Sequence, residues 1–131
     1  MNLDTMTPDP AWNPEDWTES IARLRSISGN LTIRIWCGDW CGDCRRLLPP
    51  FAAALDAIDL PEDAVMTYAV EKLGDGSKVG DGVDEYGIER TPTVVLEIGG
   101  EEVARFEEGR TPGPILESLA DQLAGIEHPT S

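Results

Sequence analysis

A run of β-forming residues leads straight into a pair of closely spaced cysteines, and an apolar helical stripe follows them. Residues 31–36, Leu-Thr-Ile-Arg-Ile-Trp, are typical of a strand. From the second cysteine onward, apolar side chains recur at helical spacing. We therefore predict a helix over residues 41–58, kinked at Pro49 and Pro50 because prolines interrupt its hydrogen-bond ladder. A strand that gives way to a helix at Cys41 is typical of an α/β fold and places both thiols at the junction.

The sequence on either side of this junction also alternates between helix and strand signals. Asn13 and Pro14 predict the start of a helix that runs to about residue 27. Residues 64–70 carry apolar side chains on both faces, which predicts a central parallel strand. Residues 71–82 contain four glycines and predict a loop.

The last third of the chain predicts a short helix, a hairpin and a closing helix. We expect the short helix at residues 83–86. Residues 93–98 and 102–106 flank Gly99-Gly100, a two-residue connection typical of an antiparallel hairpin. The closing helix has these signals: a cap at Thr111 or Gly113, a buried stripe of Ile115, Leu116, Leu119 and Leu123, and an end at Gly125.

The order of these elements combines a βαβ unit with a ββα unit, which predicts an α/β domain built on one mixed sheet. We place this single domain at residues 13–125, between a flexible N-terminal tail at 1–12 and a C-terminal tail at 126–131. Arg34 stands out in its apolar strand. In a central strand it needs an acidic partner or a path to water, whereas near an edge it needs neither, and the sequence leaves both alternatives open.

The charge balance excludes several classes of partner. The chain has 25 acidic residues against 10 basic ones, a net charge of -15 at pH 7. Such a surface suits nucleic acid poorly, because phosphates need positive charge, and it resembles halophilic proteins, in which salt screens the repulsion between carboxylates. The longest apolar run, residues 51–55, is far shorter than the roughly 20 residues that span a bilayer. No secretory signal is visible, so we expect a cytoplasmic protein that binds neither nucleic acid nor membranes.

Three cysteines in a cytoplasmic chain predict redox or metal chemistry and not a disulfide framework. At a strand-to-helix junction, Cys41 lies at the helix N-terminus, where unpaired amides and the helix dipole stabilise a thiolate. Cys41 is therefore the predicted nucleophile. Cys44 lies one turn inside the helix and is the predicted resolving thiol, which attacks the mixed disulfide that Cys41 forms.

The residues around this motif resemble the thioredoxin family. Trp40-Cys41-Gly42-Asp43-Cys44 is similar to that family's Trp-Cys-Gly-Pro-Cys centre, and Pro49 stands where the family has its helix-kinking proline. Tyr86-Gly87-Ile88 followed by Thr91-Pro92-Thr93 resembles the approach to the cis-proline loop, and Gly109 falls where the family keeps a glycine beside the active site. The resemblance covers residues 14–125 and implies a thioredoxin fold, a central mixed β-sheet flanked by helices on both faces.

The same resemblance implies a function and a set of partners. Cys41 and Cys44 are expected to cycle between dithiol and disulfide and so reduce protein disulfides, with no organic cofactor and no metal. The Thr91-Pro92 bond is expected to be cis, and the backbone of Thr91 to pair with an extended substrate segment beside Trp40, Gly42 and Gly109. The implied partners are disulfide-containing proteins and an electron donor similar to thioredoxin reductase, and we expect a monomer.

Departures from the family pattern concern proton transfer. Thioredoxins carry a buried carboxylate and a lysine where this sequence has Ile35 and Val70. Asp43 replaces the usual proline, and it is either a substitute acceptor for the proton of Cys44 or a residue that only satisfies the helix N-terminus. Its charge opposes the Cys41 thiolate, so we predict a more reducing couple than proline would give.

Other interpretations remain open. Cys37, Cys41 and Cys44 together also resemble the cluster-binding motif of radical enzymes that use S-adenosylmethionine, although this chain is too short for their barrel. Otherwise Cys37 is a small buried residue or a regulatory thiol. A module that holds partner segments at the Thr91-Pro92 loop without turnover is the alternative function. Of the remaining candidates, His128 is expected to be solvated, and Trp12, Trp17 and Trp36 are expected to be packing residues.

Overall fold

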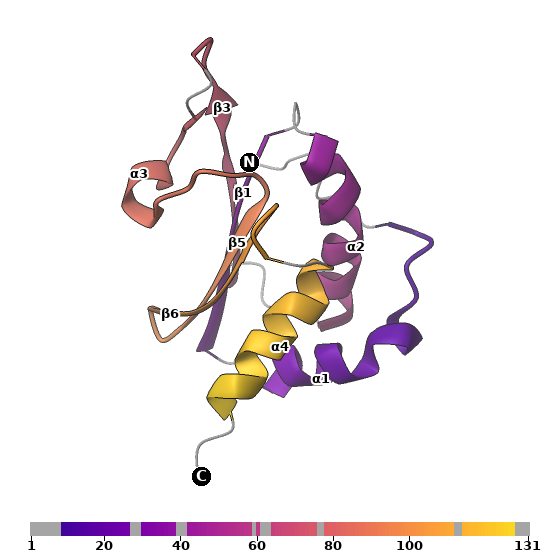
Figure 1. The fold of residues 1–131 in the computed structure, drawn as a ribbon. Helices are drawn as coiled ribbons and strands as arrows, with labels where there is room; N and C mark the ends of the chain where they lie inside the picture. The colour runs from indigo at the N-terminus through magenta and orange to yellow at the C-terminus, as the bar shows by residue number, and fades with distance from the viewer. Residues whose placement is uncertain are drawn as a thin grey trace.

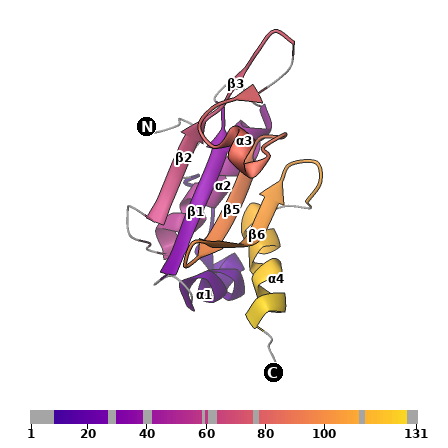
Figure 2. The same cartoon turned by 90° about the vertical axis from the view of Figure 1, so that its left-hand side faces the viewer.

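A four-stranded mixed sheet forms the centre of the molecule. The computed structural model describes residues 9–26, 30–38, 42–58, 60, 64–75, 78–111 and 114–127, except for the side chains of residues 43 and 124–127. The strands are β1 (Leu31–Cys37), β2 (Val65–Ala69), β5 (Thr93–Ile98) and β6 (Glu101–Glu107), in the spatial order β2-β1-β5-β6. β1 is parallel to β2 and antiparallel to β5, and β5 is antiparallel to β6 (Figure 2). The predicted mixed sheet is confirmed.

Helices cover both faces of this sheet, as expected. α1 (Thr18–Ser26), α2 (Gly42–Ile58) and α4 (Ile115–Glu127) lie on one face, and the short α3 (Val83–Tyr86) lies on the other (Figure 1). The side chain of Asn13 caps a 3-10 turn before α1, because it accepts a hydrogen bond from the amide of Glu15 at 3.1 Å. The predicted cap is therefore confirmed. None of the helices in the described part of the chain is long and apolar enough to span a membrane.

Two expectations about the sheet are wrong. β2 is an edge strand of this sheet and not a central strand, and Met66 is exposed within it. Apolar residues on both of its faces suit an edge strand here because one face meets the core under α2 while Tyr68 stacks on Trp36 at the other. The stretch predicted as a loop contains two short strands, β3 (Glu71–Lys72) and β4 (Lys78–Val79), which pair antiparallel. Backbone pairing over so few residues leaves no side-chain pattern in the sequence.

The closing helix ends later than predicted, and one of its two candidate caps is wrong. α4 continues through Gly125 to Glu127, because a glycine inside a helix costs only about 1 kcal/mol. Thr111 lies ahead of the helix, where its hydroxyl accepts a hydrogen bond from the amide of Glu107 at 3.1 Å. Thr111 therefore closes the turn after β6 and does not cap α4. The other candidate cap, Gly113, lies outside the described residues.

The sheet separates two clusters of buried side chains. The larger lies between the sheet and α1, α2 and α4, and it includes Leu24, Ile33, Phe51, Leu96 and Leu119. The smaller lies on the α3 face and consists of Trp36, Val70, Val83, Ile88 and Val95. Trp36 is fully buried, and Trp12 and Trp17 pack against the larger cluster, so the packing roles expected of these tryptophans are confirmed.

The α3 face also holds the arginine that stands out in the sequence. Arg34 lies in the central strand β1, and its Nε donates to Oε1 of Glu97 at 2.8 Å. Tyr86 donates its hydroxyl to the other oxygen of Glu97 at 2.8 Å, and Arg34 also donates to the hydroxyl of Tyr68. The hydrogen bond with Glu97 raises the pKa of both Arg34 and Tyr86. The acidic partner required of a central arginine is therefore Glu97.

Candidate active site

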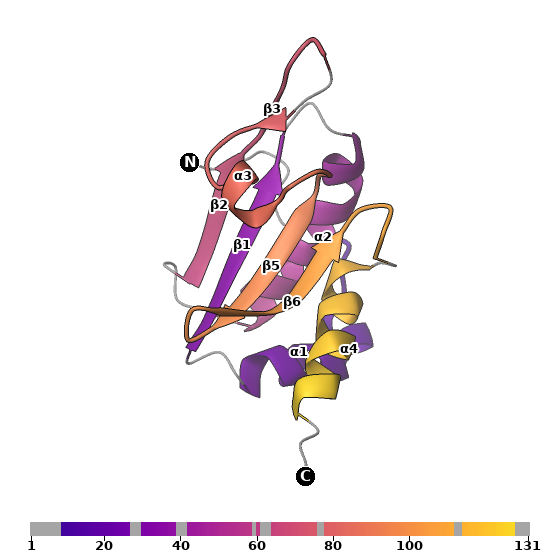
Figure 3. The same cartoon turned by 60° about the vertical axis from the view of Figure 1, so that its left-hand side comes forward.

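Three chain segments that carry predicted site residues meet at one end of the sheet. β1 ends at Cys37, directly before the cysteine motif, and Trp36 in β1 pairs with Thr93 at the start of β5. Thr93 pairs in turn with Glu107, the last residue of β6. The same end of the sheet therefore holds Pro92, the end of β1 and the turn that contains Gly109. α2 also begins at this end of the sheet (Figure 3).

The second cysteine of the motif lies inside the first turn of α2. The helix begins at Gly42, and Cys44 is fully buried in the same core cluster as Cys37 and Leu48. This burial agrees with the enclosed position expected of a resolving thiol. Trp40 and Cys41 lie outside the described residues, and of Asp43 only the backbone, in α2, is described. Their expected roles stay predictions, as does the alternative Cys37, Cys41 and Cys44 metal site.

The Thr91-Pro92 peptide bond is cis, as the resemblance implies. The loop is held by a hydrogen bond from the turn after β6 and by a local hydrogen bond across the loop itself. The amide of Glu108 donates to the carbonyl of Pro92 at 3.2 Å, and the hydroxyl of Thr93 donates to the carbonyl of Arg90 at 2.6 Å. Thr91 is only 6% exposed. The loop is therefore fixed in place, as pairing with an extended substrate segment would require.

Gly109 lies against this loop, and its lack of a side chain has a visible consequence. Its backbone has a φ of +82°, a conformation that favours glycine, and a Cβ there would come within 2.6 Å of Nη1 of Arg90. The guanidinium of Arg90 therefore lies across the glycine. The structure brings the predicted Gly109 together with Arg90, a residue that sequence reasoning did not select.

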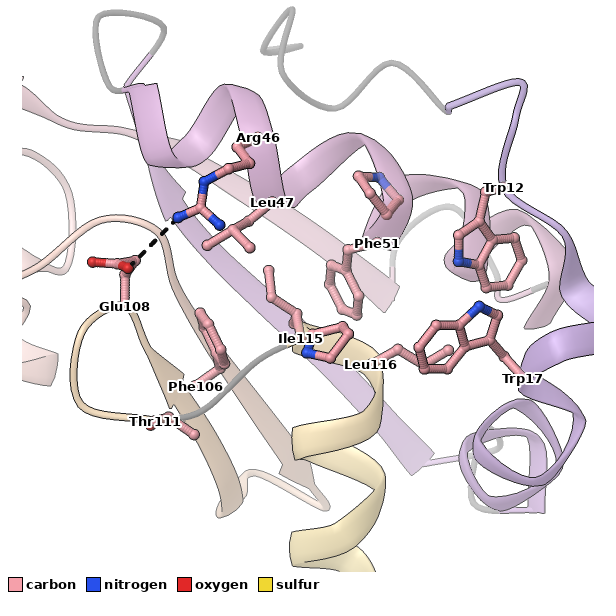
Figure 4. A pocket seen from close by; sticks show the side chains of 12 residues that line it. Trp12, Trp17, Arg46, Leu47, Phe51, Phe106, Glu108, Thr111, Ile115 and Leu116 are labelled. Atoms are coloured by element: carbon pink, nitrogen blue, oxygen red, sulfur yellow. Dashed lines mark ion pairs between the residues drawn. The ribbon is translucent and has the colours of Figure 1, made fainter.

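Ion pairs between arginines and glutamates surround the same end of the sheet. Arg46, near the start of α2, pairs with Glu108 at 3.8 Å (Figure 4). Arg110 pairs with Glu89 at 2.9 Å and with Glu107 at 3.6 Å. These pairs join α2, the loop before β5 and the turn after β6. They hold the segments around the predicted site at a modest energy each, since exposed ion pairs contribute about 0–1 kcal/mol.

An apolar pocket of about 560 Å³ borders this end of the sheet. It lies between the N-terminal segment, α2 and α4, and its apolar lining includes Trp12, Trp17, Phe51, Phe106, Ile115 and Leu116. Arg46 and Glu108 stand at one end of it (Figure 4). The amide of Asp9 donates to the carbonyl of Pro49 at 3.1 Å, so the N-terminal segment is fixed against α2 beside the pocket.

The positions of the family's buried carboxylate and lysine are apolar in the structure as well. Ile35 is fully buried in the core and Val70 is 2% exposed, so neither position offers a titratable group. Within the described ranges, no three His, Cys, Asp or Glu side chains are grouped so that they could hold a metal ion. Any proton acceptor for Cys44 must therefore come from elsewhere in the chain or from water.

Comparison with known proteins decides the family. The family model described as Thioredoxin matches residues 11–121. The chain belongs to the thioredoxin family. It is 29% identical over 92 residues to the protein named thioredoxin H-type from Fagopyrum esculentum, an alignment that covers 70% of this chain and 72% of that protein.

Two solved structures share the fold. Thioredoxin NaTrxh from Nicotiana alata is 22% identical, with a TM-score of 0.51 over 86% of each chain. The thioredoxin from Fasciola hepatica is 24% identical, with a TM-score of 0.50 over 78% of this chain and 86% of that chain. At these identities the likeness establishes the architecture of the chain.

Sequence reasoning missed two residues that the structure places in prominent positions. Glu97 carried a usable signal, because it is the one charged residue in a strand of otherwise apolar or β-branched residues. Arg34 is likewise the one charged residue in its own strand. Two such residues of opposite charge in neighbouring strands can pair across a sheet. Arg90 carried no comparable signal, since its contact with Gly109 depends on the distance between two loops.

Proposed function

We propose that this thioredoxin-family chain is a thiol-disulfide oxidoreductase that reduces disulfides in proteins. The observation that carries the proposal is the burial of Cys44 in the first turn of α2, at the end of the sheet where the Thr91-Pro92 loop and Gly109 also lie. Membership of the thioredoxin family supports the same reaction class. The proposed site works with its own two thiols and takes its electrons from an external dithiol donor, in the cytoplasm.

The proposed reaction balances as two thiol exchanges. The Cys41 thiolate attacks one sulfur of a substrate disulfide, which forms a mixed disulfide and releases one substrate thiolate. The Cys44 thiolate then attacks the Cys41 sulfur, which forms the Cys41-Cys44 disulfide and releases the second substrate sulfur as a thiolate. The substrate gains two electrons and the chain loses two. An external dithiol donor then reduces the Cys41-Cys44 disulfide through the same two exchanges. The donor is oxidised to a disulfide, and both thiols of the chain are restored.

The fold supplies a physical reason for each role. Cys41 directly precedes α2, so the unpaired amides and dipole of a 17-residue helix favour its thiolate. Cys44 is fully buried, so it is protected from outside disulfides and is available to a sulfur already bound to Cys41. The Thr91-Pro92 loop would receive the extended substrate segment, as expected from the family resemblance.

The test is turnover of a disulfide-containing protein such as insulin, with dithiothreitol as electron source. Cys41→Ser should reduce the rate to that of dithiothreitol alone, whereas Cys37→Ala should keep most of the wild-type rate because Cys37 has no role in either exchange. Reduced Cys44→Ser, mixed with the substrate after dithiothreitol is removed, should accumulate a mixed disulfide, which mass spectrometry detects as substrate covalently bound to the protein.

Retention of full activity by Cys41→Ser would contradict the proposal. The alternative would then be a module that binds partner segments at the Thr91-Pro92 loop without turnover. Loss of activity in Cys37→Ala, together with iron or another metal in the anaerobically purified protein, would favour the three-cysteine metal site.

A further inference from the structure

We infer that Arg90 recognises a carboxylate next to the disulfide-bonded cysteine of the substrate. The preferred substrates then carry an acidic residue beside the disulfide that is reduced. The inference rests on the proposed function and deepens it by naming the substrate class. Arg90 lies immediately before Thr91 and Pro92, the loop proposed to receive the substrate. Its guanidinium lies against Gly109, the glycine expected beside the substrate segment, so its charge lies close to the residues expected to flank the substrate cysteine.

Arg90 is a cation whose acidic neighbours are already occupied. Glu89 and Glu107 pair with Arg110, and Glu108 pairs with Arg46. Within the described part of the chain, the guanidinium of Arg90 makes no ion pair or hydrogen bond, and the residue is exposed. A chain with 25 acids for 10 bases has a large excess of carboxylates that could neutralise such a cation, and none of the described ones does so.

The second observation is the way in which Gly109 accommodates the arginine. A Cβ at that position would lie 2.6 Å from Nη1 of Arg90, so the absence of a side chain leaves room for the guanidinium across the backbone. The guanidinium therefore reaches from the loop before β5 to the turn after β6. A guanidinium in this position presents a planar set of donors, which matches a carboxylate better than a lysine would.

The overall charge makes this local cation selective. A net charge of -15 repels acidic partners at long range, so an acidic substrate gains only where a positive group lies close to it. Arg90 provides that group at the loop. An acidic residue beside the attacked cysteine is therefore expected to be recognised, whereas acidic residues elsewhere on the substrate are repelled.

The experiment uses short peptides with one internal disulfide that differ only beside one cysteine, where they carry Glu, Gln or Lys. The measured quantity is the ratio of kcat/KM for the Glu peptide to that for the Gln peptide, with dithiothreitol as donor. This ratio should fall about two- to fivefold in Arg90→Gln at low salt, the range expected for an exposed ion pair. The fall should shrink at molar salt. Arg90→Glu should instead favour the Lys peptide.

Arg25→Gln is the charge control, because it removes the same charge from α1, at the opposite end of the molecule (Figure 1); Arg25 also donates a hydrogen bond to the carbonyl of Ala57, so its urea midpoint is measured alongside. It should keep the wild-type ratio. An unchanged ratio in Arg90→Gln, or an equal fall in Arg25→Gln, would overturn the assignment of this selectivity to Arg90 while leaving the reaction intact. Failure of the wild-type chain to reduce any of the three peptides or a protein disulfide would instead overturn the proposed function, and this inference with it.

Discussion

Removal of Arg34 should destabilise the fold more than removal of its partner Glu97, although both substitutions break the same ion pair. The pair joins neighbouring strands at 2.8 Å, and its side chains differ in exposure: that of Glu97 is 7% exposed and that of Arg34 is 24% exposed. In Arg34→Met, Glu97 stays buried with only the hydroxyl of Tyr86 as a described donor. In Glu97→Leu, the long stem of Arg34 can carry its charge toward water.

The magnitudes follow from this asymmetry. Loss of one partner from a buried pair costs about 3–5 kcal/mol, so we expect about 3 kcal/mol for Arg34→Met. Glu97→Leu should cost about 2 kcal/mol, because the arginine it leaves behind is only partly buried. The double variant should lie within about 1 kcal/mol of wild type, since apolar replacement of a whole buried pair is often close to neutral.

The assay is urea unfolding of the reduced protein at fixed salt, followed by tryptophan fluorescence, with the free energy of unfolding taken from the midpoint and slope. Arg110→Met is the control, because Arg110 pairs with Glu89 at a similar 2.9 Å but both side chains are about half exposed, at 47% and 66%. It should cost less than about 1 kcal/mol. Additive single effects in the double variant, or a greater cost for Glu97→Leu than for Arg34→Met, would refute the reasoning.

Two further predictions concern the redox couple and alkaline pH. Asp43→Pro removes the negative charge two residues after Cys41 in the sequence, so the reduction potential should rise by on the order of 10–30 mV, as measured by equilibration with a glutathione buffer; an unchanged or more negative potential would contradict this. The raised pKa of Tyr86 means that its stabilising contribution is complete below about pH 10, the usual phenol pKa, and is lost as the pH rises through the folded value. The difference in urea midpoint between wild type and Tyr86→Phe should therefore shrink between pH 8 and pH 11, and a difference that is constant with pH would be evidence against it.

Much of the fold follows from local patterns. The run of β-formers at residues 31–36 and the apolar stripe after it are sufficient for β1 and α2, because hydrophobic periodicity within one element depends only on that element. The Gly99-Gly100 connection likewise predicts the hairpin, and both glycines have positive φ, at +60° and +87°. The place of β2 at the edge could not be predicted in this way, since strand order depends on which elements pair and not on the pattern within one of them.

The candidate site divides along the same line. By itself the sequence determined the cysteine motif, its place between a strand and a helix, and the Thr91-Pro92 and Gly109 signals, because these features are contiguous in the chain. Only the tertiary structure decided that Glu97 neutralises Arg34, that Cys44 is fully buried, and that the guanidinium of Arg90 lies across Gly109. Each of these depends on the spacing of segments that are distant in sequence, which is fixed when the sheet and its helices pack together.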